Sequence, residues 1–172
     1  MVALAIFSFV VIAMVVLQVF GFKMTALTQS KLGSIGYTLK ALDQVRNQVR
    51  SAYSIQVGNG TGAAFTVTGT SGTTLRIFPT TNSNYMQVYL DTNSATLYML
   101  NSLNNNQYAI ASSISNQTIF QAVNYQGVVS TNNPGHYAIK MTLKFAQLGY
   151  QIPVSTYDYY TLEAAMTPRA QN

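Results

Sequence analysis

The stretch that decides the fold is "MVALAIFSFVVIAMVVLQVFGFK", residues 1–23. It carries no charge before Lys23, and Ser8 and Gln18 are its only plainly polar side chains. As a helix, residues 1–22 would be ~33 Å long at ~1.5 Å per residue, which is enough to cross a bilayer core of ~30 Å. We therefore expect a membrane-quality helix in this part of the sequence.

Two other interpretations fit this segment less well. A cleaved signal peptide needs a basic front end, a shorter apolar run and a small-residue cleavage site, and none of these is clear here. A buried core helix is the second alternative, and the length and hydrophobicity argue against it. The positive residues all follow the segment, which by the positive-inside rule would place the rest of the chain in the cytoplasm. Because that remainder looks extracytoplasmic, we expect a basic leader before Met1.

The apolar pattern changes after residue 23. A set of residues spaced by three and four positions predicts an amphipathic helix that packs on the rest of the chain: Ile35, Leu39, Leu42, Val45, Val49 and Ala52. A nearly continuous helix from about residue 2 to about residue 53 would be ~75 Å long. Its first half is apolar all round and its second half has one face to bury, so we expect a stalk joined to a head.

Glycines mark the weak points of this helix, and each costs about 1 kcal/mol relative to alanine. Gly21, Gly33 and Gly36 either produce simple bends or form a stretch that melts when the stalk packs among its neighbours.

From Tyr53 onward the apolar pattern has a period of two, with turn residues between short segments. Strands are expected at 53–57, 65–68, 73–78, 85–90, 95–100, 107–111, 118–125, 136–146 and 157–166. The clearest is "HYAIKMTLKFA", 136–146, with Ile139, Met141, Leu143 and Phe145 on the core face together with Tyr137. Glu163 is expected to meet Lys140 or Lys144 across a hairpin.

The predicted fold class is therefore α+β: a long N-terminal helix packed on a C-terminal antiparallel β-sheet. The helical stalk covers residues 1–53, divided into 1–22 and an amphipathic part at 23–53, and the head covers 54–172.

The low content of charged residues indicates which binding partners are to be expected. Only 8% of residues are charged, against about 25% in soluble domains. The body is polar through amides and hydroxyls, so its surfaces repel one another weakly and tolerate packing against copies of themselves. The net charge of +5 permits a nucleic-acid partner, but the nine Lys and Arg residues form no run that supports one. Cysteine is absent, which excludes disulfides and Cys metal sites.

Residues that could carry chemistry are few. His136 is the only histidine and has no evident nucleophile or carboxylate partner. "DTNS", 91–94, offers too few carboxylates for a calcium site and is interpreted as a turn. "GNGTG", 58–62, lacks the continuation of a phosphate loop. Asn59 and Asn116 begin matches to the glycosylation signal, which arise easily by chance. We expect no enzyme activity, no cofactor and no metal.

The order of apolar helix, amphipathic continuation and antiparallel sheet resembles type IV pilins and pseudopilins. The resemblance is carried by "MVALAIFSFVVIAMVVL" (1–17), by "YTLKALDQVRNQVRSAY" (37–53), and by "HYAIKMTLKF" (136–145) with "YTLEAAMTPRAQN" (160–172), which are similar to parts of minor pilins. The family's leader, the glutamate after its cleavage site, its helix-breaking proline and its C-terminal disulfide loop have no counterpart in this sequence. The resemblance implies that Gly21 replaces the proline as the soft point of the helix. We expect the numbering to begin inside the mature protein or the start to be assigned too late.

The resemblance implies a structural subunit of a helical surface filament. The unassembled subunit would sit in the inner membrane, and an assembly platform would build it into an extracellular filament of identical copies. The residues implied to pack in the filament core are Val2, Leu4, Ile6, Phe7, Phe9, Val10, Ile12, Val15, Leu17, Val19 and Phe20. Two alternatives stay open: a minor pseudopilin of a type II secretion system, and a single-span anchored extracytoplasmic binding module.

Overall fold

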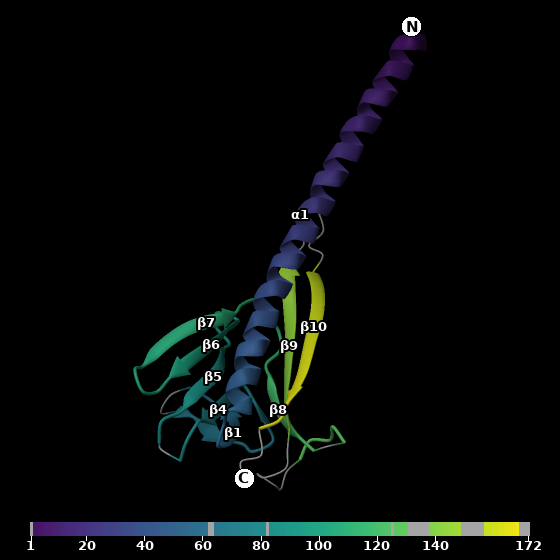
Figure 1. The fold of residues 1–172 in the computed structure, drawn as a ribbon. Coiled ribbons are helices and arrows are strands. Elements are labelled where there is room, and N and C mark those ends of the chain that lie inside the picture. Colours follow the sequence, from purple (N-terminus) through teal and green to yellow (C-terminus); the bar gives the residue numbers. More distant parts are fainter. Residues whose placement is uncertain are drawn as a thin grey trace.

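The computed structural model describes residues 2–61, 64–81, 83–124, 126–130, 138–148 and 157–168. One long helix is followed by short strands, and its N-terminal half projects well beyond them (Figure 1). The elements are α1 (Val2–Arg50), β1 (Ser54–Asn59), β2 (Thr66–Val67), β3 (Ser71–Gly72), β4 (Thr74–Phe78), β5 (Met86–Asp91), β6 (Thr96–Asn101), β7 (Asn106–Ala111), β8 (Phe120–Val123), β9 (Ala138–Leu148) and β10 (Tyr157–Met166). The fold is α+β, with an apolar N-terminal helix and antiparallel sheets.

The helix ends at Arg50, slightly earlier than expected. The Ser51 hydroxyl donates to the Gln48 carbonyl at 3.1 Å, an acceptor that the last turn leaves open because the Ala52 N–H bonds to Val49 O instead. The same hydroxyl is 3.1 Å from Asn47 O, which also accepts the Ser51 N–H at 3.2 Å. Two residues later the backbone N–H of Tyr53 donates to Phe78 O at 2.8 Å. The chain therefore turns directly from the helix into pairing with β4.

The strands form two sheets, whereas the sequence predicted one. The larger sheet has six strands in the order β2-β1-β4-β5-β6-β7, and the smaller has four in the order β10-β9-β8-β3. The division falls between β7 and β8, which are not paired in the described strands: β7 is an edge of the larger sheet, and β8 pairs with β9 in the smaller one. Ser71 and Gly72, which we expected in a turn, pair with Gln121 and Phe120 of β8 at the edge of the smaller sheet. The chain therefore visits the edge of the smaller sheet in β3 and returns to the larger sheet in β4.

Two glycines permit close backbone contacts where the sheets meet, Gly72 between the two sheets and Gly58 within the larger one. A Cβ built on Gly72 would lie 2.0 Å from the carbonyl oxygen of Gly58, and one built on Gly58 would lie 2.2 Å from Thr66 O. These are backbone atoms that no side-chain rotation can move. The two sheets approach this closely at β3 and β1 only because Gly72 has no side chain, whereas the close contact of Gly58 with Thr66 lies between β1 and β2 of the larger sheet.

The lower half of α1 packs against the head, between the edge strands of the two sheets. It contacts β7 of the larger sheet and β10 of the smaller one, and Figure 1 shows it running between them. Buried side chains of α1 join one hydrophobic core with residues of both sheets: Ala41, Leu42, Val45 and Val49, followed by Ala52 just after the helix. Thr38 is buried as well, at 2% exposure.

Leu39 is a correction to the sequence prediction, because its side chain is 48% exposed. The buried face is centred on Thr38, Val45 and Val49, and at 3.6 residues per turn Leu39 points ~100° away from Thr38. Leu39 fits the spacing of four and three residues between Ile35 and Leu42. The buried positions in this part of the helix are instead Thr38 and Ala41, which the sequence prediction did not include. The side chain of Ile35 lies outside those that the structure describes.

Strand β9 has the predicted alternation, with one face in the core and one towards solvent. Ile139, Met141, Leu143 and Phe145 are buried, and Lys144 is exposed. The prediction for Tyr137 and His136 falls outside the described residues. The alternation confirms this strand because successive side chains point to opposite faces.

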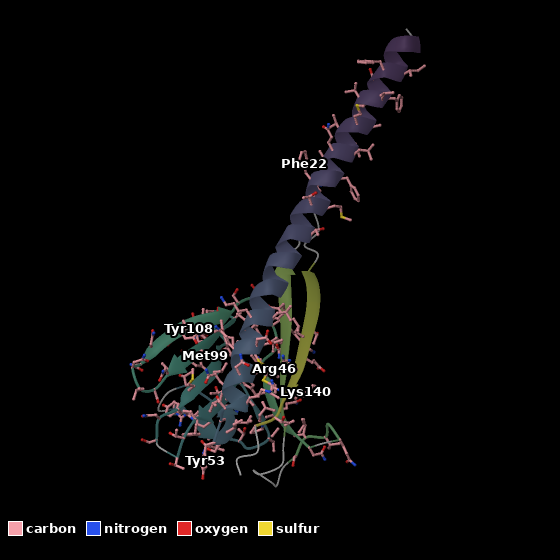
Figure 2. The ribbon with its side chains drawn as sticks, in the orientation of Figure 1. Phe22, Arg46, Tyr53, Met99, Tyr108 and Lys140 are labelled. Carbon is pink, nitrogen blue, oxygen red and sulfur yellow. The ribbon has the colours of Figure 1, made fainter. Side chains whose placement is uncertain are left out.

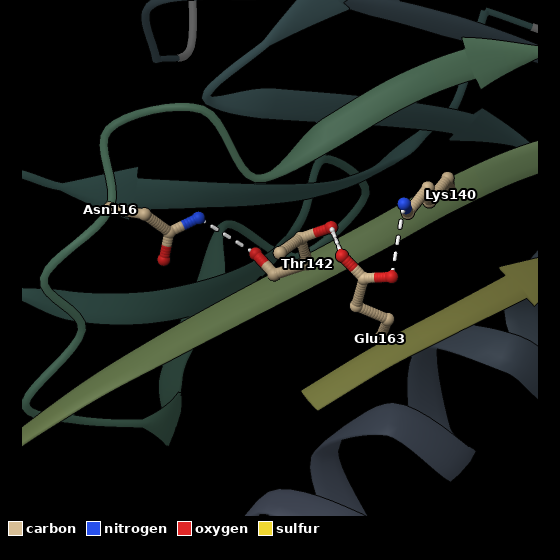
Figure 3. Close-up of polar contacts among 4 residues, drawn as sticks. All are labelled: Asn116, Lys140, Thr142 and Glu163. Atoms are coloured by element: carbon tan, nitrogen blue, oxygen red, sulfur yellow. Dashed lines mark hydrogen bonds and ion pairs between the residues drawn. The ribbon is translucent and has the colours of Figure 1, made fainter. Parts of the chain in front are cut away.

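The expected ion pair across the last hairpin is present. Lys140 Nζ lies 3.0 Å from Glu163 Oε2, and the Thr142 hydroxyl donates to Glu163 Oε1 at 3.4 Å (Figure 3). In the register of β9 and β10, Glu163 lies opposite Thr142 and Ala165 opposite Lys140, so the charges meet on a diagonal. Both side chains are partly exposed, at 34% and 51%, and solvent therefore weakens their attraction.

A charge swap measures this pair. Lys140→Glu and Glu163→Lys are each expected to lower the free energy of unfolding by about 0.5–1 kcal/mol, and the double swap should recover most of that loss. The coupling should shrink in about 1 M salt because screening is then nearly complete. Thermal unfolding of the four proteins gives the coupling, and a value of zero at low salt would mean that the contact contributes nothing.

Candidate functional site: the exposed apolar half of the helix

The half of α1 that projects from the head exposes apolar side chains in every direction. Figure 2 shows these side chains around the helix, with Phe22 labelled. The predicted core-packing residues that the structure describes are 46–77% exposed: Ile6, Phe7, Phe9, Val10, Ile12, Val15, Leu17, Val19 and Phe20. Val2 and Leu4 lie in the helix, but their side chains are outside those described.

Further apolar side chains belong to the same surface, although the sequence prediction did not assign them. These are Val11, Met14, Val16, Phe22 and Met24, each at least 43% exposed. We call the whole set, from Ile6 to Met24, the apolar rod. A single partner could cover only one stripe of such a rod, so covering it completely requires lipid or several neighbours.

The apolar rod has the length of a membrane span. Residues Ile6–Thr25 have a mean hydropathy of 2.2, and none of that window is buried against the head. A signal sequence near an N-terminus meets the same criterion of length and composition. The rod therefore supports association with a membrane, and no more than that follows from hydropathy alone.

The helix is continuous through Gly21, the predicted soft point. A Cβ at Gly21 would meet no atom within 4 Å, so close packing within this chain does not require the glycine. The hydroxyl of Thr25 donates to Gly21 O at 2.9 Å, and that of Thr28 donates to Met24 O at 2.8 Å. Both hydroxyls are thus satisfied inside the helix, as an apolar environment demands, and bonds of this kind also favour bending.

The "DTNS" segment forms the turn that the sequence predicts. Asp91 Oδ1 accepts from the backbone N–H of Asn93 at 3.0 Å, and Oδ2 accepts from the Ser94 hydroxyl at 2.7 Å. The bond from Ser94, followed by that from Asn93, holds the pKa of Asp91 below its ordinary value. The carboxylate is therefore charged and fixed in position at neutral pH.

The "GNGTG" loop has a structural role that the sequence did not reveal. Gly60 has φ of +88°, and its carbonyl accepts hydrogen bonds from Thr74 Oγ1 at 2.7 Å and Gln87 Nε2 at 3.1 Å. Thr74 and Gln87 are almost fully buried, at 1% and 0% exposure. The glycine thus lets the loop fold onto the larger sheet and give these polar side chains an acceptor.

Asn116 belongs to one of the two glycosylation matches. Its side-chain amide bonds to the backbone of β9 in the way that the backbone of a neighbouring strand would. Its Oδ1 accepts from Lys144 N at 2.8 Å, and its Nδ2 donates to Thr142 O at 2.8 Å and to Thr118 O at 2.5 Å (Figure 3 shows the Thr142 bond). The amide nitrogen that a glycan would occupy is already committed twice. In the folded head Asn116 therefore acts as a structural residue.

Removing this amide tests the structural role. Asn116→Ala is expected to lower the free energy of unfolding by about 1–3 kcal/mol, because the Lys144 N–H and the Thr142 carbonyl lose their partner. The matched control is Gln117→Ala, at the exposed neighbouring position, which should change stability by less than about 0.5 kcal/mol. Equal effects of the two substitutions, measured by thermal unfolding, would contradict the assignment.

The other candidates contribute little. His136 lies outside the described residues. Among the residues that the structure does describe, no group of three or more His, Cys, Asp or Glu side chains could hold a metal ion. The Asp43–Arg46 pair, at 3.0 Å, lies on the exposed side of α1 and stabilises a surface turn of the helix.

Comparison with known proteins leaves the family open. No protein-family model, no curated protein and no solved structure matches the chain. The resemblance to type IV pilins thus stays a prediction, and the apolar rod with its attached head is the main candidate for a functional site in the described residues.

Proposed function

We propose that the protein is a structural subunit of a type IV pilus-like filament, held in the inner membrane by the apolar rod before assembly and packed through it against identical copies afterwards. Assembly would use a pilus assembly platform and place the heads on the outside of an extracellular filament. The observation that carries the proposal is the apolar rod itself, exposed on all sides and continuous with a helix that is locked into a head.

The exposure of the rod supports two successive environments. Leu17 and Phe9 are 69% and 77% exposed, and leaving such side chains in water costs about 1.5–3 kcal/mol each. Lipid covers the whole circumference of a single copy. Outside lipid, a bundle of copies is the arrangement that covers it from all directions, since neighbouring helices pack about 8–10 Å apart.

The attachment of the helix to the head supports a regular assembly. Val45 and Val49 are fully buried, at 0% exposure, and α1 lies between β7 and β10. The helix therefore cannot change its direction relative to the head without opening the core. When identical rods pack with one repeated geometry, their heads are carried into one repeated wall, which is how contacts that do not close build a fibre.

The head has a surface suited to close contact between copies. The whole chain has four acidic and nine basic residues, so few like charges meet when heads approach. Within the described head, turns such as those at Asp91 and Asn116 are held by internal hydrogen bonds. Neighbouring heads can then touch without large costs of desolvated charge or of ordering loops.

The experiment is to shear cells that express the full chain and to image the released material by electron microscopy with antibody against the head. Long fibres labelled along their length are expected. Short labelled stubs confined to the cell envelope would instead favour a pseudopilin. If the full chain is found only in the membrane as single copies, the filament proposal is wrong and an anchored module remains.

A further inference from the structure

A hollow on the larger sheet is a second place where this molecule could bind something. Its volume is about 380 Å³, within the range of about 300–1,000 Å³ that small-ligand sites occupy. Three neighbouring strands and a loop contribute to it, and its lining residues are Thr61, Tyr89, Leu90, Asp91, Thr92, Tyr98 and Gln107. Tyr89 and Asp91 alternate along β5 with Val88, which is in the core, so they point to the face away from α1.

The aromatic part of the hollow is a pair of stacked rings. Tyr89 lies directly opposite Tyr98 in the register of β5 and β6, with ring centroids 5.7 Å apart and an interplanar angle of 25°. Tyr89 is buried, whereas Tyr98 is only partly buried, and the Gln107 side chain lines the same hollow. The inner ring thus holds the outer one in place, and Tyr98 remains available to a ligand.

The polar part of the hollow is pre-arranged. Asp91 is fixed by bonds from Asn93 N and the Ser94 hydroxyl, one on each oxygen. A carboxylate has about four lone-pair positions, so Asp91 keeps capacity to accept further hydrogen bonds. Gln107 presents an amide, which both donates and accepts, and Thr61 and Thr92 add hydroxyls.

We propose that this hollow binds a neutral sugar, with the Tyr98 ring as the stacking surface and Asp91 and Gln107 as hydrogen-bond partners. Sugar hydroxyls bond strongly to a carboxylate, and the weakly positive C–H groups of a sugar ring suit the negative face of an aromatic ring. A cationic ligand would also suit Asp91 and the rings, but it would meet a chain of net charge +5. Most lining groups are uncharged donors and acceptors, which match hydroxyls.

This inference does not depend on the proposed filament. The lining residues belong to the head, and none lies in α1. A head that binds sugar can be carried by a filament or by a single anchored chain. Failure of sugar binding therefore says nothing against the filament, and failure of assembly says nothing against sugar binding.

The test uses the full chain in a detergent without a sugar headgroup. Saturation-transfer NMR is recorded with methyl glycosides of glucose, galactose, mannose and N-acetylglucosamine, each at about 10 mM, tenfold above a Kd of 1 mM. The cation tetramethylammonium is measured in parallel. At least one glycoside is expected to receive saturation, while tetramethylammonium receives none.

Three variants locate the binding. Tyr98→Ala and Asp91→Asn should each weaken the affinity for the glycoside about tenfold, by loss of the stacking surface or of a charged acceptor. Asparagine retains an acceptor for the Asn93 N–H, so the turn is kept. Tyr53→Ala removes a tyrosine that is 55% exposed and not part of the hollow, and it should leave binding unchanged.

Three results would overturn the proposal. One is the absence of binding by every glycoside, and another is binding of tetramethylammonium alone. The third is that the Tyr98→Ala and Asp91→Asn variants bind the glycoside with the same affinity as the Tyr53→Ala control. Thermal unfolding of each variant checks that the head is folded. If Tyr98→Ala does not fold, the affinity of Asp91→Asn for the glycoside decides the test.

Discussion

Val15→Asp is expected to remove the protein from both the membrane and the filament while leaving the head folded. Val15 lies in the middle of the apolar rod, with 52% of its side chain exposed to whatever surrounds the helix. A carboxylate at the centre of an apolar membrane helix costs about 2.5–3.5 kcal/mol, which corresponds to roughly 100-fold in an equilibrium. In a bundle of identical rods the same charge would also be repeated in every copy, which adds repulsion.

The measurement compares the amount of chain in carbonate-washed membranes and in sheared fibres. Asn47→Asp is the matched control, since it adds the same charge on the exposed side of α1 beside the head. The control should retain the wild-type amounts, whereas Val15→Asp should reduce both by about 100-fold. Wild-type yields of fibre from Val15→Asp would mean that the rod is not the assembly surface.

Gly72→Ala is expected to have the largest effect on the stability of the head. The new Cβ would lie 2.0 Å from the carbonyl oxygen of Gly58, so the junction of the two sheets must separate. Overpacking of this kind costs typically 1–3 kcal/mol and more when backbone must move, so we expect a loss of at least about 3 kcal/mol. For a chain of this size the melting temperature should fall by roughly 6–12 °C.

Gly36→Ala is the control for this substitution. A Cβ there meets no atom within 4 Å and the residue is helical, so the same chemical change should leave stability unchanged or raise it by up to about 1 kcal/mol. Thermal unfolding of both variants, followed by the near-ultraviolet circular dichroism of the tyrosines, gives the comparison. A Gly72→Ala protein as stable as Gly36→Ala would show that the two sheets are not joined as described.

The sequence predicts well those elements that are long enough to have a recognisable pattern of apolar residues. The apolar helix, the strand at Ala138–Leu148 and the final strand Tyr157–Met166 follow from runs long enough to have a repeat. The Lys140–Glu163 pair could be anticipated because two adjacent antiparallel strands place their charges within reach.

What the sequence could not predict depends on neighbours that are distant along the chain. Ser71 and Gly72 form a strand of two residues, too short to have a period, and the separation of the two sheets depends on β8 pairing with β9 and not with β7. The prediction for Leu39 was wrong because a pattern of apolar residues does not include the polar Thr38, which is the residue buried against the head at this position.

The candidate sites divide in the same way. The apolar rod could be predicted almost entirely, because its signal lies in consecutive residues. The hollow at Tyr89 and Tyr98 could not, because nine positions separate the two rings and only the β5–β6 register places them together. The structural role of Asn116 could not be predicted either, because its partners Thr142 and Lys144 lie 26 and 28 positions further along the chain.

The most direct test of the central claim is whether rods of different copies touch in the assembled state. The chain has no native cysteine, so a spin label at Leu17→Cys in the rod and one at Leu103→Cys on the β6–β7 turn can each be introduced alone. Dipolar electron spin resonance of the polymer should detect strong coupling at position 17, from helices about 8–10 Å apart, and weaker coupling at position 103. The coupling should vanish when labelled chains are diluted with unlabelled ones. Uncoupled labels at position 17 in an assembled sample would contradict the account.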